Sequence, residues 1–184
     1  MPTNPKILDL KKHSREVKRA LELAEELQSI GSKLGFNAFQ PGAMKELKMA
    51  NLLGHDWIIS KKDADACSKN NDGIDLYEYL SGKEGGAGQI DRVFKDDAKD
   101  AEQHQKHENS MKRIRRNKAF YLAYTNRDTT KPLDILRIYE VPREAIEEET
   151  KKQLAKSKNT ISHVAFNEDF AEKYGQPVYR KKRP

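Results

Sequence analysis

Apolar residues recur at spacings of three and four along two stretches near the start of the chain. In residues 14–34 and 43–53 they form a stripe along one side, which predicts two amphipathic helices. Residues 35–42 contain two glycines and a proline and separate the helices, and Gly54 closes the second one. Each apolar stripe is expected to be buried against another part of the protein.

The pattern then changes to the residue types of β-strands. Short strands are expected at 57–59 and 74–80, because both are rich in aromatic and aliphatic residues and the turn sequence NNDG lies between them at 70–73. Glycines concentrate in 82–88, which predicts a loop, and 97–116 is expected to be a long helix that is polar on nearly every face. Such a helix faces solvent or lines a charged cleft.

The last third of the chain alternates strands and helices. Residues 119–125 and 134–139 predict an antiparallel pair, and Pro142 starts a helix that ends near Leu154. Helices followed by strands mixed with helices are typical of a single mixed α+β (α/β) domain. The final expected elements are a strand at 161–166, a helix at 167–174 between Asn167 and Gly175, and a strand at 177–180.

Length and composition limit the class of protein. The chain has 184 residues, of which 36% are hydrophobic, enough for one domain with a packed core. No apolar run reaches the roughly 18–20 residues of a membrane span, and residues 1–12 lack the apolar stretch of a signal peptide. A cytoplasmic protein with no membrane contact is therefore expected. Cys67 is the single cysteine, which excludes a disulfide within the chain and a cysteine-based zinc site.

Positive charge is concentrated in the second half of the chain. Residues 1–100 hold 16 basic and 17 acidic side chains, whereas 101–184 hold 19 and 12. This imbalance favours a polyanionic partner, although a solvated helix face and a basic tail at 181–184 would give the same counts. The densest basic run, which has no acid within it, comprises Lys112, Arg113, Arg115, Arg116 and Lys118.

Carboxylates are concentrated around the expected hairpin. The expected type I′ turn has Asp72 and Gly73 at its centre. In that register Asp65 and Glu78 fall on one face as diagonal neighbours, with Cα atoms roughly 7–8 Å apart. Two carboxylates at that distance can converge on one cation, which in a basic protein suggests a metal ion acting on phosphate. The alternative is that Asp72 and Asp75 shape the turn and the other acids are solvated, and a turn shifted by one residue would reverse which residues share a face.

The order of these elements and the hairpin acids resemble the PD-(D/E)XK nuclease superfamily, and within it the small homodimeric type II restriction endonucleases of the PvuII kind. In that superfamily a hairpin carries one Asp, then a Glu and usually a Lys two residues later. The resemblance covers most of the chain, as order and pattern rather than as high identity, and it implies a central mixed sheet flanked by helices. It rests on GFNAFQPGAMKELKMANLLG (35–54), DADACSKNNDGIDLYEYLSG (63–82), NKAFYLAYTNRDTTKPLDILRIYEVPREAIEEE (117–149) and NTISHVAFNEDFAEKYGQPVYR (159–180).

The resemblance implies a metal site at the hairpin. Asp65 matches the first metal-binding acid and Glu78 the second, and the implied cofactor is Mg²⁺. Leu80 stands where the superfamily has its lysine, which is thought to position or deprotonate the attacking water. Lys83 is the nearest catalytic substitute, but it has the wrong strand parity unless Gly82 forms a bulge. A lysine from another element, or activation of the water by the ions alone, would also fit.

A third acid is a weaker candidate for the same site. Glu46, on the second expected helix, resembles an acid that some superfamily members add. The simpler interpretation is a solvated partner for Lys45 or Lys48.

The implied substrate is double-stranded DNA, cut at a short palindromic site by a homodimer, because the two strands of a palindrome require two symmetric sites. The basic run at 112–118 is expected to contact phosphates without reading sequence. Asn159 and Ser162 suit hydrogen bonds to base edges, but they would equally serve as a turn residue and a strand polar residue. The candidate base contacts are Lys158, Asn159, Ser162 and His163, with Gln89 and Arg92 as a second group.

This interpretation divides the domain into three parts. Residues 14–54 are helices and a candidate dimer contact, 57–125 carry the hairpin and basic helix, and 133–180 carry the DNA-recognition strands and helices. A cognate DNA methyltransferase is implied, although not as a stable partner. Two other functions stay open: a structure-specific repair or junction nuclease, and a non-catalytic basic nucleic-acid-binding protein, which the missing lysine favours.

Overall fold

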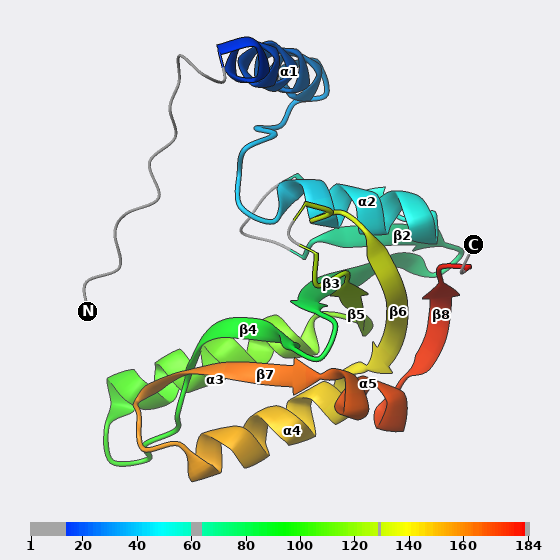
Figure 1. The fold of residues 1–184 in the computed structure, drawn as a ribbon. Helices are drawn as coiled ribbons and strands as arrows, with labels where there is room; N and C mark the ends of the chain where they lie inside the picture. Colours follow the sequence, from blue (N-terminus) through cyan, green and yellow to red (C-terminus); the bar gives the residue numbers. More distant parts are fainter. Residues whose placement is uncertain (1–13, 60–63, 129, 183–184) are drawn as a thin grey trace. The chain divides into compact units, whose positions relative to one another are not determined.

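The chain divides into two compact units, residues 1–44 and 45–184. The computed structural model describes residues 14–59, 64–128 and 130–182 (Figure 1). Within its described residues the first unit contains α1 (Ser14–Lys33) and the start of α2 (Ala43–Leu53). The second unit contains the rest of α2, both sheets and the other helices.

α1 ends where the chain turns back on the helix. The N–H of Phe36 donates to the carbonyl oxygen of Gly31 at 2.9 Å. A Cβ at Gly31 would lie 2.9 Å from the carbonyl oxygen of Phe36, so glycine allows this close return. Of the apolar stripe that predicted the helix, Val17, Ala24 and Leu27 are half-buried, whereas Leu21, Ile30 and Leu34 are exposed. The helix is confirmed, and the burial of its stripe stays a prediction.

The second unit is built on a six-stranded mixed sheet with the order β1-β2-β3-β5-β6-β8. β3 and β5 are parallel, and every other neighbouring pair is antiparallel. The parallel pair requires a crossover, and the intervening chain supplies it. The mixed α+β fold with a central sheet flanked by helices is therefore confirmed. The strands are β1 (Asp56–Trp57), β2 (Ala66–Asn70), β3 (Gly73–Lys83), β5 (Ala119–Thr125), β6 (Ile135–Pro142) and β8 (Gln176–Arg180).

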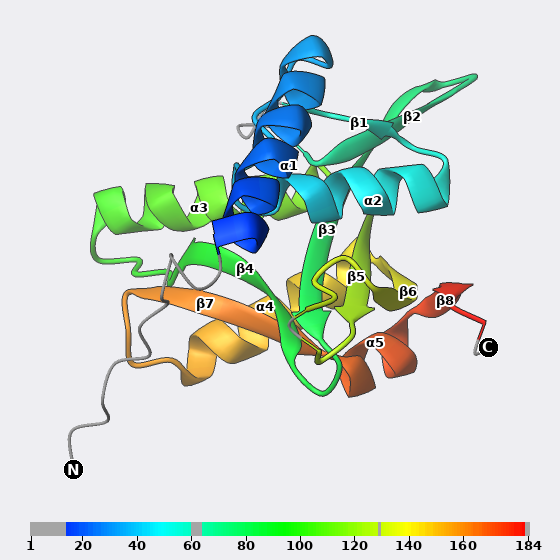
Figure 2. The same ribbon diagram turned by 45° about the horizontal axis from the view of Figure 1, so that its top comes forward.

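A second sheet lies within the same unit. β4 (Ala87–Phe94) and β7 (Ile161–Asn167) pair in antiparallel fashion, although they come from distant parts of the sequence. α3 (Ala101–Arg115) packs against β4, and α4 (Arg143–Lys156) packs against β7 and α3 (Figures 1 and 2). α5 (Glu168–Tyr174) connects β7 to β8.

The central sheet separates two hydrophobic clusters. Met49 and Ala50 of α2 join Tyr77 and Tyr79 on one face. Leu80 points to the other face and joins residues of α3, α4 and the small sheet. This alternation along β3 sends Glu78 to the same face as Leu80, toward α3. α2 therefore packs on the sheet, whereas the sequence interpretation had grouped it with α1.

The glycine-rich segment expected to be a loop is mostly strand. β3 continues to Lys83 and β4 begins at Ala87. A Cβ at Gly82 would lie 2.7 Å from the carbonyl carbon of Ala87, and one at Gly88 would lie 2.9 Å from the Cβ of Leu80. These glycines allow two strands to approach closely, which is a different use from a flexible loop.

The long polar helix begins later than expected, at Ala101 instead of residue 97. The Oδ1 atom of Asp100 accepts hydrogen bonds of 3.0 Å from the N–H groups of Glu102 and Gln103, which is an N-cap. The antiparallel β5–β6 pair, α4, β7 and α5 are confirmed. Asn167 caps α5 as expected, by accepting from the N–H of Phe170 at 2.9 Å.

Two further expectations concern the membrane and the tail. None of the helices in the described residues is both long and apolar enough to cross a bilayer. The expected basic tail is partly ordered, because the N–H of Lys181 donates to the carbonyl of Leu136 and its ammonium pairs with Asp134 at 2.5 Å. Residues 183–184 lie outside the described residues.

Candidate active site

The β2–β3 hairpin has its turn one residue earlier than predicted. Asn70 pairs with Gly73 and Cys67 pairs with Leu76, so the central residues are Asn71 and Asp72. The side chain of Asn70 selects this turn, because its oxygen accepts from the N–H of Asp72 at 2.9 Å. The pairing moves by two residues relative to the prediction, and the residues that share a face stay the same.

In this register Asp65 lies one residue beyond the end of the β2–β3 ladder, next to the part of β3 that carries Glu78. The last ladder pair is Ala66 with Tyr77, and the N–H of Asp65 continues the contact to the carbonyl of Tyr77 at 3.0 Å. The Oδ2 atom of Asp65 accepts from the N–H of Tyr79 at 2.8 Å. Its carboxylate is therefore held against the backbone of β3 at Tyr79, the residue that follows Glu78.

Glu78 is a partly buried carboxylate with an unsatisfied oxygen. Its Oε2 atom is buried and has no hydrogen-bond partner among the described residues. Burial and then the negative charge of Asp65 raise the pKa of Glu78 to about 7, against the opposing effect of two arginines. Two carboxylates that share a site destabilise each other's charged form, so a cation placed between them would be stabilised.

The two opposing cations are Arg113 and Arg116, at the end of α3. The short link from α3 to β5 explains their position. Ala119 pairs with Tyr77 in the parallel ladder, and the N–H of Lys118 donates to the carbonyl of Leu76 at 2.8 Å. The chain therefore returns to β3 within a few residues of α3, which places the helix end near Glu78.

The basic run does not form one surface, contrary to the sequence interpretation. Arg115 pairs with Glu147 at 2.9 Å, and Lys118 pairs with Asp75 at 2.6 Å. Lys112 is exposed. Residues that are adjacent along a helix point in different directions, so a basic run in the sequence is divided among several surfaces.

Glu46 of α2 also contributes to this electrostatic environment. Its charge raises the pKa of Glu78 further, as the smallest of the named effects. The indole Nε1 of Trp57 donates to Oε2 of Glu46 at 3.4 Å, which holds the side chain. α2 packs on the face of Tyr77 and Tyr79, opposite Glu78, so Glu46 acts on Glu78 through its charge and stays a prediction as an acid of the site. Its spacing ahead of the buried Met49 and Ala50 was the sequence signal for an inward-facing position.

Lys83 is not positioned to replace the missing lysine. The parallel register of β3 with β5 runs without a shift from Tyr77 to Lys83, so Gly82 forms no bulge against β5. Lys83 is exposed, has the strand parity opposite to Glu78 and stands five residues away, roughly 16 Å along an extended strand. Leu80 has the correct parity, but it is 6% exposed and packed in the core. The bulge at Gly82 that Lys83 would need to reach the site is therefore not formed against β5.

The candidate base-contacting residues gather on the small sheet. Gln89 and Arg92 come from β4, and Ser162 and His163 come from β7, which pairs with it. Lys158 and Asn159 are exposed in the segment that leads into β7. Ser162 shares a 2.7 Å hydrogen bond with Ser157, and Nδ1 of His163 lies 2.7 Å from Oδ1 of Asp91. The tertiary structure thus unites two groups that are more than sixty residues apart in the sequence.

The donor set at the hairpin fits Mg²⁺. Asp65 and Glu78 offer carboxylate oxygens, and the buried Oε2 of Glu78 has its lone pairs unused within the described residues. Among those residues no three His, Cys, Asp or Glu side chains gather into a metal-binding group, so Glu46 does not complete one. Mg²⁺ usually keeps several waters and needs only one or two carboxylates, so Asp65 and Glu78 would suffice to hold it.

Comparison with known proteins leaves the chain without an assigned family. No protein-family model matches it, and no curated protein matches it.

Proposed function

We propose that the protein is a Mg²⁺-dependent type II restriction endonuclease that cuts both strands of DNA at a short palindromic site. The observation that carries this proposal is the buried Oε2 of Glu78, which has no hydrogen-bond partner in the part of the chain that the structure describes and feels the charges of Asp65, Arg113 and Arg116. Paired carboxylates and adjacent cations are what hydrolysis of a phosphodiester requires.

The residues would divide the work as follows. Asp65 and Glu78 would hold the ion, and Mg²⁺ bound there would supply positive charge for the phosphate and for activation of the attacking water. Asp65 is pre-oriented by the N–H of Tyr79. Arg113 and Arg116 supply positive charge toward the phosphate as negative charge builds on it.

The arginines also account for the missing lysine. Leu80 can neither donate a hydrogen bond nor stabilise hydroxide, and it is buried in the core. The positive charges that lower the pKa of Glu78 come from Arg113 and Arg116 at the end of α3 instead of from β3. Arginine remains protonated at any working pH, so it would stabilise charge without taking part in proton transfer.

Site specificity and a homodimer are part of the same proposal. The small sheet presents Gln89, Ser162 and His163 on adjacent strands, a two-stranded ribbon of the kind that can enter the major groove. The exposed apolar side chains of α1, which include Leu21 and Ile30, favour a contact between two copies. A cognate methyltransferase would then protect the host DNA without being a stable partner.

A second candidate is a DNA-binding protein that does not cut. The buried Leu80 in the position of the superfamily lysine favours it. In that case the raised pKa of Glu78 is only the result of its burial between Asp65 and the helix.

One incubation distinguishes these functions. Purified protein is mixed with supercoiled plasmid DNA with Mg²⁺ or with EDTA, and Asp65→Ala is the matched control. Discrete bands that need Mg²⁺ and Asp65 support a restriction enzyme, whereas cutting confined to branched or damaged substrates indicates a repair nuclease. Retarded but intact DNA, with Mg²⁺ present and across many sequences, contradicts the nuclease proposal.

A further inference from the structure

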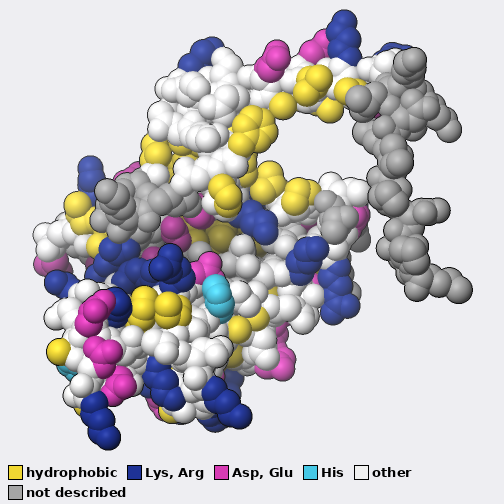
Figure 3. Space-filling view, turned by 90° about the vertical axis from the view of Figure 1, so that its left-hand side faces the viewer, with side chains coloured by type: hydrophobic (Ala, Val, Ile, Leu, Met, Phe, Trp, Pro, Cys, Tyr) yellow, Lys and Arg dark blue, Asp and Glu magenta, His cyan; other side chains and the backbone are white. Residues whose placement is uncertain are grey.

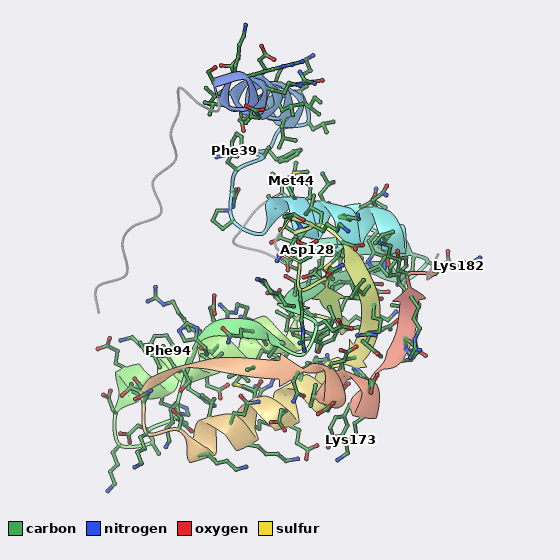
Figure 4. All side chains as sticks on the ribbon, in the orientation of Figure 1. Phe39, Met44, Phe94, Asp128, Lys173 and Lys182 are labelled. Carbon is green, nitrogen blue, oxygen red and sulfur yellow. The ribbon has the colours of Figure 1, made fainter. Side chains whose placement is uncertain are left out.

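A groove on the face formed by α3 and β4 carries three cations and no acid among the residues that line it. Its volume is about 350 Å³. Figure 3 shows Lys and Arg side chains gathered on this face of the unit, and Figure 4 labels Phe94, which comes from β4. The groove is lined by Arg92, Phe94, Lys106, Asn109, Ser110 and Arg113.

Arg92 enters this groove from a β-bulge. Between the pairs Ile90 with Val164 and Val93 with Ser162, two residues of β4 face one residue of β7. Arg92 has φ 55°, the only positive φ at a residue other than glycine within the described part of the chain. The left-handed conformation is unfavourable for a side chain with a Cβ, so the bulge holds Arg92 at a cost that glycine would avoid.

The surrounding contacts hold the bulge in place. An Nη2 of Arg113 donates to the carbonyl oxygen of Asp91 at 2.8 Å. The Asp91 side chain in turn lies 2.7 Å from Nδ1 of His163, across the small sheet. Strained residues that their neighbours hold in a single conformation occur mainly at sites of function, so the bulge points to a role for Arg92.

The other two cations are spaced along one side of α3. Lys106 and Arg113 are seven residues apart, which is two helical turns or about 10 Å. The ammonium of Lys106 lies 5.9 Å from the centre of the Phe94 ring, and it also pairs with the exposed carboxylate of Glu102. Ser110, between them, uses its hydroxyl within the protein, since it donates to the carbonyl of Lys106 at 2.9 Å.

The groove shares one residue with the candidate active site. Arg113 lines the groove, and its charge also lowers the pKa of Glu78. Arg116, the C-cap of α3, has the same effect on Glu78 but is not among the residues that line the groove. A row of cations that extends over two turns suits several phosphates of one strand better than a single small anion. We propose, as an extension of the proposed function, that this groove binds the DNA backbone beside the phosphate to be cut, with Arg92 as a dedicated phosphate contact.

Binding without cleavage tests the groove. Fluorescence anisotropy follows a labelled 20-base-pair duplex of random sequence in EDTA, over a range of salt concentrations. Arg92→Gly should reduce affinity several-fold on every sequence and lower the slope of log affinity against log salt by about one. Lys106→Ala should act in the same direction. Lys69→Ala, at an exposed position of β2, is the matched control and should bind like the wild type.

Stability separates this role from a structural one. Glycine accommodates φ 55° without strain, so Arg92→Gly should keep or raise the midpoint of thermal unfolding while DNA binding falls. Wild-type affinity and salt slope in both Arg92→Gly and Lys106→Ala would overturn the proposal, as would a loss seen only on duplex RNA of the same sequence. If the wild-type protein never cuts DNA but Arg92→Gly and Lys106→Ala still bind DNA more weakly, the nuclease function is refuted and the groove remains a DNA-binding site.

Discussion

The Oδ2 atom of Asp65 accepts a 2.8 Å hydrogen bond from the backbone N–H of Tyr79, the residue that follows Glu78 in β3. This bond fixes Asp65 relative to β3, the strand that carries Glu78, so that each carboxylate feels the charge of the other. The negative charge of Asp65 is one of the causes of the raised pKa of Glu78. The first predictions follow from this coupling.

Replacement of Asp65 separates its charge from its hydrogen bond. Asp65→Asn keeps an oxygen that can accept from Tyr79, whereas Asp65→Ala leaves that N–H without its partner. Both variants should lose Mg²⁺-dependent cleavage, but only Asp65→Ala should lose about 1 kcal/mol of unfolding free energy. Plasmid cleavage and urea unfolding measure the two effects. Cleavage at the wild-type rate by Asp65→Asn would exclude Asp65 as a metal ligand.

Glu78→Gln should change how stability depends on pH. Burial raises the pKa of Glu78 from 4.5 to about 7 in the folded protein. The unfolded chain therefore ionises at a lower pH than the folded protein, so the free energy of unfolding is unaffected below pH 4.5, falls as the pH rises and is lowest above pH 7. Glutamine cannot ionise, so the variant should gain up to about 3 kcal/mol over the wild type between these pH values. Urea unfolding in metal-free buffer at pH 4.5 to 8 measures the gain. A constant difference across that range would mean that the pKa is not raised.

A divalent ion should stabilise the wild-type protein in the same pH range. Ca²⁺ serves as the probe, because it binds oxygen ligands as Mg²⁺ does. The thermal midpoint should rise on addition of Ca²⁺ at pH 8, and rise less at pH 6, where protons compete for Glu78. Glu78→Gln and Asp65→Asn should show little response. An equal rise in all three proteins would place the ion elsewhere.

Arg116 should matter more for the chemical step than Lys83 does. Arg116→Gln removes a cation that faces Glu78, and the loss of one such group typically costs about 10²- to 10³-fold in rate. Lys83→Ala should cleave almost normally, since Lys83 is exposed on the strand parity opposite to Glu78. Single-turnover cleavage with saturating enzyme makes the comparison. A severe defect in Lys83→Ala with a normal Arg116→Gln would reverse this assignment.

Asn159 should affect sequence discrimination instead of general affinity. Asn159→Ala should cost about 1–3 kcal/mol on the cognate site and leave binding to random DNA unchanged, as expected for a contact to a base edge. Binding to the two kinds of DNA in Ca²⁺ provides the measurement. Equal losses on both would assign Asn159 to the backbone or to the turn before β7.

Much of the local structure was determined by the sequence alone. The period of the apolar stripe located α2, the caps Asn167 and Gly175 located α5, and the residues of the NNDG turn located the hairpin. These features depend on neighbours within a few residues, and so they are visible in the sequence. Strand parity survives a shift of two residues, so the observed register leaves the prediction that Asp65 and Glu78 share a face unchanged.

The tertiary structure alone decided which charges meet. Arg113 and Arg116 face Glu78 because β5 pairs in parallel with β3 and draws the end of α3 to that strand, a contact between segments more than thirty residues apart. The absence of a bulge at Gly82, the close approach of β3 and β4 and the pairing of β4 with β7 likewise depend on contacts between distant segments. The sequence determined that acids and cations were present, and packing between strands and helices determined their neighbours.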